Sequence, residues 1–177
     1  MADLQIRAAC AADTLTIVTW FSNHEAARSW GGPAIPDPLT AVWLAGELDD
    51  TAQVYRTAIN AGVVVGFYGL RLFASEARGH LRRFATAPSQ RRQGLGRILM
   101  KDAAAEAARR GLRRLTLNVY GSNLNARLAY ERLGWHVTGS SAAPEDSSGL
   151  RYEMELQIVS TQQSHGSGRG ADADGTR

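Results

Sequence analysis

The chain has 177 residues, of which 44% are hydrophobic and 21% charged, with 20 basic side chains against 17 acidic ones. This length and composition fit one soluble globular domain with its own core. The lone Cys10 excludes an internal disulfide framework or a site built from several cysteines, and no apolar run reaches the roughly 18 residues of a membrane span.

The basic residues are arginine except for Lys101, and they are interspersed with acidic ones without any run of five like charges. Such mixing does not predict a nucleic-acid partner. A nucleic-acid-binding module that uses the arginine surface stays as a rival class, and a steeply salt-dependent DNA affinity would favour it. Without a leader-like or membrane-spanning stretch, we expect a cytoplasmic protein.

The first third of the chain alternates short strands and helices. Residues 4–8 alternate apolar and polar side chains and predict a strand. Asp13 and Thr14 are candidate N-caps for a helix that runs to about Phe21. Two more short helices are expected at 25–30 and 40–48, separated by a Gly- and Pro-rich loop.

The rest of the chain predicts a hairpin followed by alternating strands and helices. The Asn60-Ala61-Gly62 turn joins strands 54–59 and 63–73. The further expected elements are strand 80–87, helix 97–110, strand 114–120, helix 123–133 and strands 135–141 and 150–158. This order indicates an α/β (α+β) fold with a mixed, mostly antiparallel sheet of about seven strands flanked by about four helices.

We expect a single domain over 1–159. The segment 160–177 contains no large apolar residue and is predicted to be a disordered tail, in which His165 is solvated.

The stretch 80–100 predicts an anion site. A strand stopped by Pro88 leads through a loop containing Gly94 and Gly96 into an Ala- and Leu-rich helix. Unpaired amides and the dipole at a helix start favour negative charge. The flanking arginines 91, 92 and 97 add hydrogen-bond donors, so the pattern favours a pyrophosphate. No Gly-Lys-Ser/Thr follows, and Leu99 replaces the third glycine of a dinucleotide fingerprint.

Two blocks identify a family resemblance. The first is Arg91-Arg92-Gln93-Gly94-Leu95-Gly96 after a strand, and the second is an Asn-initiated helix, 123–133, that ends in Tyr130-Glu131-Arg132-Leu133-Gly134-Trp135. With a strand between them, they resemble the GNAT superfamily of acetyl-CoA-dependent N-acetyltransferases. The likeness is sharp over about 80–138 and implies an acyl-CoA N-acyltransferase-like fold with acetyl-CoA as the cofactor.

The resemblance implies a role for each matching position. The backbone of Phe84, Ala85 and Thr86 would hold the pantetheine arm, and the Thr86 amide would stabilise the oxyanion. Asn123 would contact the pantetheine side, and Tyr130 would lie near the sulfur as a general acid or a cofactor contact. The pyrophosphate would be bound by the loop and helix start, namely Arg91, Arg92, Gln93, Gly94, Leu95, Gly96 and Arg97. No metal is expected.

The general base of some relatives has no match in this sequence. Asn118 stands where those relatives carry a Glu that serves as general base, and an amide cannot accept the proton. His80 lies six residues before Thr86, on the same strand face because even separations share a face, and histidine has a suitable pKa. For His80 we favour a surface histidine without a catalytic role. For Tyr130 core packing is the alternative, but its place in the second block favours a role in the site.

The resemblance implies direct transfer of the acetyl group to a primary amine in a ternary complex, since Cys10 is poorly placed as a nucleophile. The alternative is a non-catalytic acyl-CoA-binding or sensing domain. The acceptor is expected to be a small-molecule amine or a peptide or protein amine, bound near the segment 21–48. We expect a monomer or homodimer, with no nucleic-acid or membrane partner.

Overall fold

The computed structural model describes residues 3–158. Its seven strands form one sheet in the order β1-β2-β3-β4-β5-β7-β6. The strands are β1 (Leu4–Ala8), β2 (Gln53–Asn60), β3 (Val63–Phe73), β4 (Arg78–Thr86), β5 (Arg114–Tyr120), β6 (His136–Ala142) and β7 (Leu150–Gln157). All neighbours are antiparallel except β4 and β5, so the predicted mixed sheet is confirmed.

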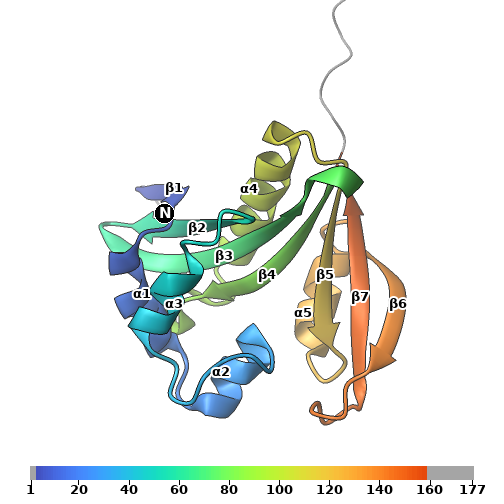
Figure 1. Ribbon diagram of the computed structural model, residues 1–177, viewed down its shortest axis with the longest axis horizontal. Coiled ribbons are helices and arrows are strands. Elements are labelled where there is room, and N and C mark those ends of the chain that lie inside the picture. The colour runs from blue at the N-terminus through green and yellow to red at the C-terminus, as the bar shows by residue number, and fades with distance from the viewer. Residues whose placement is uncertain (1–2, 159–177) are drawn as a thin grey trace, which may run out of the picture.

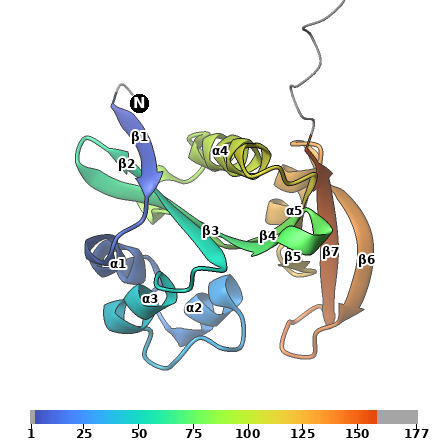
Figure 2. The same ribbon diagram turned by 45° about the horizontal axis from the view of Figure 1, so that its top comes forward.

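Helices cover both faces of the sheet (Figures 1 and 2). The helices α1 (Ala11–Ile17), α2 (His24–Gly31) and α3 (Ala41–Glu47) lie on one side of β2–β4, and α4 (Leu95–Arg109) and α5 (Leu124–Glu131) lie on the other. Within residues 3–158 there are five α-helices, close to the predicted number of about four, and the short helix expected at 25–30 is α2, which Asn23 caps.

Two apolar cores follow from this arrangement. The larger core packs α4 residues such as Leu99 and Ala103 against Leu70, Leu115 and Met154 of the sheet. The smaller core packs α1 and α3 around Phe67. Trp135, a large aromatic residue just before β6 and expected in the core on that ground, is 3% exposed and belongs to the larger core.

The N-terminal helix differs from its prediction. It begins at Ala11 with Cys10 as the N-cap residue, and the Asp13 carboxylate accepts the Cys10 amide hydrogen at 2.9 Å. Asp13 is thus the third helical residue, where a carboxylate reaches back to the cap. A lone cysteine is commonly a small buried or half-buried residue, but Cys10 is exposed, which corrects that expectation.

A bulge in β4 interrupts the alternation of its side chains. Phe67 and Gly69 are two residues apart in β3, whereas their partners in β4, Ala85 and Arg82, are three residues apart, so β4 has one extra residue there. Arg83 is the extra residue, and its φ of 51° is left-handed. Its guanidinium is buried beside α2 and α3 and pairs with the Glu47 carboxylate at 2.7 Å. A bulge of one residue inverts the faces on its two sides.

The predicted tail, including His165, lies outside the described residues. Across residues 3–158, no helix is both long and apolar enough to cross a membrane, and no group of three metal-ligating side chains occurs.

Candidate cofactor and acceptor site

The parallel strands β4 and β5 pair only at their first residues. Their register covers Arg78 with Arg114, Gly79 with Leu115, and His80 with Thr116, and it ends there. Beyond His80, the edge of β4 that faces β5 has no strand partner in the described part of the chain. The backbone from Leu81 to Thr86 therefore keeps hydrogen-bonding groups available to a ligand.

The Thr86 amide points to that free edge. Ala87 donates its amide hydrogen to the Val65 carbonyl at 2.8 Å, and Gly66 is opposite Thr86 in the register. Hydrogen-bonded and non-bonded pairs alternate in antiparallel strands, so the Thr86 N–H faces away from β3. The Phe84 amide faces the same way by the same alternation.

The start of α4 lies just after this strand. Gly94 is the N-cap with a left-handed φ of 84°, and the amides of Leu95 and Gly96 have no acceptor among the described residues. A Cβ built on Gly96 would meet only Phe84, at 3.9 Å, so the space above this amide is open. The predicted strand, glycine loop and helix start are therefore together in space.

The loop before α4 carries unpaired positive charge. Arg91, Arg92 and Arg97 are exposed and form no ion pair with a described carboxylate. Gln93 donates from its amide to the Ser89 carbonyl at 2.8 Å and so steadies the loop. Three free guanidiniums around open helical amides suit a pyrophosphate.

Beyond His80 and Thr116 the strands β4 and β5 are no longer paired, and we call the space between them the gap. Tyr130 of α5 faces this gap from the other side. Its ring packs edge-on against Phe84 at 6.5 Å between centroids and lies 6.1 Å from Trp135. Burial raises the pKa of Tyr130 to about 12, and its hydroxyl has no hydrogen-bond partner within residues 3–158. Asn123 is the N-cap of α5, and its side-chain oxygen accepts the Ala126 amide hydrogen at 3.2 Å.

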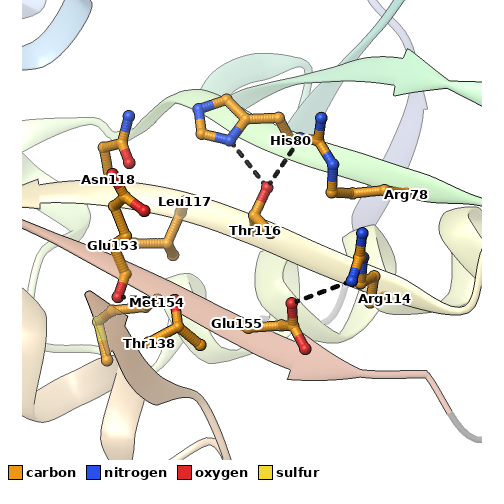
Figure 3. Close-up of a pocket in the computed structure, with 10 residues that line it drawn as sticks. All are labelled: Arg78, His80, Arg114, Thr116, Leu117, Asn118, Thr138, Glu153, Met154 and Glu155. Carbon is orange, nitrogen blue, oxygen red and sulfur yellow. Dashed lines mark hydrogen bonds and ion pairs between the residues drawn. The ribbon is translucent and has the colours of Figure 1, made fainter. Parts of the chain in front are cut away.

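His80 is half-buried within β4 rather than exposed at a strand start. Its Nδ1 lies 3.0 Å from the Thr116 hydroxyl (Figure 3). Burial, reinforced by neighbouring arginines such as Arg78 and Arg82, lowers the pKa of His80 to about 4. The imidazole is therefore neutral near pH 7, as a base must be, but it binds a proton weakly.

The prediction that the side chains of His80 and Thr86 share a face of the sheet is wrong. His80 and Arg82 lie on the α1–α3 side, where Arg82 contacts Gln53, while Phe84 beyond the bulge packs on the α5 side. Ala85 then returns to the α1–α3 side, which puts the Thr86 side chain opposite that of His80. The extra residue at Arg83 is the cause, and no periodicity in the sequence marks it.

A pocket of about 360 Å³ opens on the side chain of His80. Strands β4, β5, β6 and β7 supply its lining, which includes Thr116, Asn118 and Glu153 (Figure 3). Sequence reasoning missed Glu153, although the alternation of β7 puts it on the polar face. Its position directly opposite Asn118 is a matter of register between distant strands.

Comparison with known proteins agrees with this geometry. A family model for the acetyltransferase (GNAT) family matches residues 19–135. The chain is similar to a streptothricin acetyltransferase of Streptomyces lavendulae, 35% identical over 82 residues, which are 46% of this chain and 43% of that protein. The match thus spans less than half the length of this curated relative.

Solved structures share the fold. One is spermidine N-acetyltransferase from Vibrio cholerae with CoA and spermine, with a TM-score of 0.74, 18% identity and coverage of 90% of this chain and 98% of that one. Another is PaiA N-acetyltransferase from Thermoplasma acidophilum with coenzyme A, with a TM-score of 0.68, 19% identity and coverage of 88% and 99%. The family match extends over most of the chain and includes the β4–α4 junction and α5. The chain belongs to the GNAT family of acetyltransferases, whose cofactor is acetyl-CoA.

Proposed function

We propose that the chain transfers the acetyl group of acetyl-CoA directly to a primary amine. The observation that carries this proposal is the free edge of β4 beyond His80, which ends at the open amides of α4. An extended ligand arm can pair with such an edge as a further strand would, while its anionic end meets the helix start.

The residues present fit the cofactor. The amides of Leu95 and Gly96 and the arginines 91, 92 and 97 would hold the pyrophosphate, and the edge from Phe84 to Thr86 would hold the pantetheine arm. When bound there, acetyl-CoA supplies an acetyl group already activated as a thioester. Asn123 is occupied as a helix cap, so we expect its contact with the cofactor to be secondary.

The Thr86 amide is the proposed oxyanion donor, because a fixed backbone N–H stabilises developing charge without reorganisation. His80 lies six residues away, which is roughly 20 Å along an extended strand at about 3.3 Å per residue. One water cannot connect the imidazole to a group held at that distance, so a base at His80 requires the acetyl group and the amine to lie nearer to His80 than Thr86 does. The Phe84 amide faces the same gap nearer to His80 and is the second candidate donor.

Tyr130 is proposed to donate a hydrogen bond to the departing thiolate, and a proton that it passes to the sulfur is regained from the attacking amine, which loses one on forming the amide. A phenol with a pKa of about 12 stays protonated at neutral pH, and the Tyr130 hydroxyl is not engaged by another described residue. Because the chain's one thiol, Cys10, lies at the start of α1, we propose attack by the amine itself, helped chiefly by positioning of the two reactants. Small-molecule amines are the favoured acceptors, since the similar proteins are named for streptothricin and spermidine.

Two measurements test this function. Acetyl-CoA at millimolar concentration should raise the melting temperature, and an amine panel should release free CoA thiol in the presence of the enzyme. Absence of any shift would refute the cofactor site. A clear shift without thiol release from any amine would support the alternative, a non-catalytic acyl-CoA-binding or sensing domain.

A further inference from the structure

The pocket beside His80 lies on the one sheet face that the helices leave open. The α1–α3 group covers β2–β4, and in the described chain no helix lies over the same side of β5, β7 and β6 (Figure 2). The pocket begins where β4 and β5 stop pairing, at His80 and Thr116. It therefore adjoins the proposed cofactor gap from the side opposite to α5.

One formal charge in this pocket lacks a partner. Arg78 pairs with the Glu76 carboxylate at 2.8 Å, and Arg114 lies 3.8 Å from both Glu76 and Glu155. Glu153 is exposed and has no ion-pair partner among residues 3–158. An unpaired carboxylate within a polar pocket favours a cation.

The other arginines on this face are directed elsewhere. Arg82, which neighbours His80, donates to Gln53 at 3.0 Å and lies 3.9 Å from the Glu47 carboxylate. Arg151 shares the face of Glu153 on β7, two residues before it, but its guanidinium donates to the Ser141 hydroxyl of β6 at 3.2 Å. Arg151 is not among the residues that line the pocket.

The Thr116 hydroxyl engages one ring nitrogen of His80 and leaves the other without a partner among residues 3–158. It lies 3.0 Å from His80 Nδ1, and it also accepts from Arg78 at 3.4 Å and lies 3.5 Å from the Gly79 carbonyl. An ammonium at Nε2 requires the tautomer with its hydrogen on Nδ1, in which Nδ1 donates to Thr116 and Nε2 keeps a lone pair. Nε2 points away from Thr116, toward the end of the pocket that holds Asn118 and Glu153 (Figure 3).

The open end of the pocket thus presents three acceptors. They are the Glu153 carboxylate, His80 Nε2 and the side-chain oxygen of Asn118, which is opposite Glu153 in the register. A primary ammonium has three N–H donors and one positive charge, so it matches this set in number and sign. A carboxylate would meet like charge at Glu153 and a lone pair at His80.

We propose that Glu153, with His80 and Asn118, binds a primary ammonium group of the acceptor in this pocket. The proposal rests on the amine-acetylating function proposed above and names the residues that select the amine. Glu153 thereby supplies the carboxylate that Asn118 cannot provide.

A ligand titration without acetyl-CoA tests the proposal. The chain has four histidines, so the imidazole signals are few, and a His80→Gln variant assigns the one from His80 by NMR. The probes are n-butylammonium, butyrate and tetramethylammonium at constant ionic strength. Only n-butylammonium should shift the His80 signal saturably, because it alone combines positive charge with three N–H donors.

Matched variants localise the binding. Glu153→Gln should weaken n-butylammonium binding about ten- to hundredfold, as expected for loss of a charged hydrogen-bond partner. Glu155→Gln, whose carboxylate already lies near Arg114, should leave the affinity unchanged.

Three results would overturn the proposal: a His80 shift with butyrate, an equal shift with tetramethylammonium, or unaltered binding in Glu153→Gln. None of them depends on acetyl transfer. Failure to release thiol with any amine would refute the proposed function and leave this titration interpretable.

Discussion

Replacing Glu47 by alanine should destabilise the protein strongly. The Arg83 side chain is 1% exposed, and its guanidinium lies 2.7 Å from the Glu47 carboxylate and 4.8 Å from the Trp43 ring. Removing one partner of a buried pair costs about 3–5 kcal/mol because the other charge stays uncompensated. Glu47 is itself 26% exposed, and Arg83 keeps a hydrogen bond to the Gly31 carbonyl, so we expect about 3 kcal/mol.

Urea unfolding at constant pH measures this loss. A change of about 3 kcal/mol lowers the melting temperature by roughly 6–12 °C in a chain of this size. Glu155→Ala is the matched control, since its partner Arg114 is half-exposed at 3.8 Å, and it should cost less than about 1 kcal/mol. The double variant Glu47→Ala/Arg83→Met should recover much of the stability, because no buried charge remains. Equal effects of Glu47→Ala and Glu155→Ala would refute the reasoning.

Four further changes test the site and its surroundings. Gly96→Ala should leave stability intact, because its Cβ meets only Phe84 at 3.9 Å, but should reduce the melting shift with acetyl-CoA. Gly46→Ala, also in open space, is its control, and an undiminished shift in Gly96→Ala would argue against phosphate contact there. Tyr130→Phe should lower turnover more than it raises the acetyl-CoA KM, and unchanged turnover would assign Tyr130 to packing. The unfolded chain takes up a proton at His80 below about pH 6.5, whereas the folded pKa is about 4. Stability should therefore fall as the pH drops through that window, and His80→Gln should flatten the fall in an acid unfolding series. Hydrogen bonds from Ser122 and Ser148 lower the pKa of Asp146 to about 2 from 3.8. Their stabilising effect is present above about pH 4 and lost toward pH 2, so Asp146→Asn and the native chain should converge in stability there; a constant difference would contradict this linkage.

Local patterns in the sequence determined most of the elements. Strands 63–73 and 114–120 have the predicted bounds, and Gly62 takes the left-handed conformation that the Asn60-Ala61-Gly62 turn requires. Gly94 likewise marks the start of α4, since it is the N-cap with a φ of 84°, although the helix begins at Leu95, two residues before the predicted position. These features depend on neighbouring residues, so their signals lie in short stretches of sequence.

The site residues identified from motifs are close to the β4–α4 junction because the chain itself connects them. Phe84, Gly94 and Gly96 lie within one strand, loop and helix start. The meeting of Tyr130 with Phe84 depends on α5 packing across the sheet, and the family resemblance implied it where periodicity did not. Their roles toward cofactor and acceptor stay predictions.

Only the tertiary structure decided which side chains share a face near the gap. The bulge at Arg83 separates His80 from the face of Thr86, and the buried Glu47 pair shows how the extra residue is accommodated. Glu153 lies opposite Asn118 because β7 lies between β5 and β6 and pairs with β5 in this register. Strand order and register are properties of the whole sheet. The sequence by itself determined the elements and the β4–α4 loop, since these rest on local periodicity and turn residues. Contacts between distant strands depend on the packing of the whole sheet, so the pocket was decided by the fold.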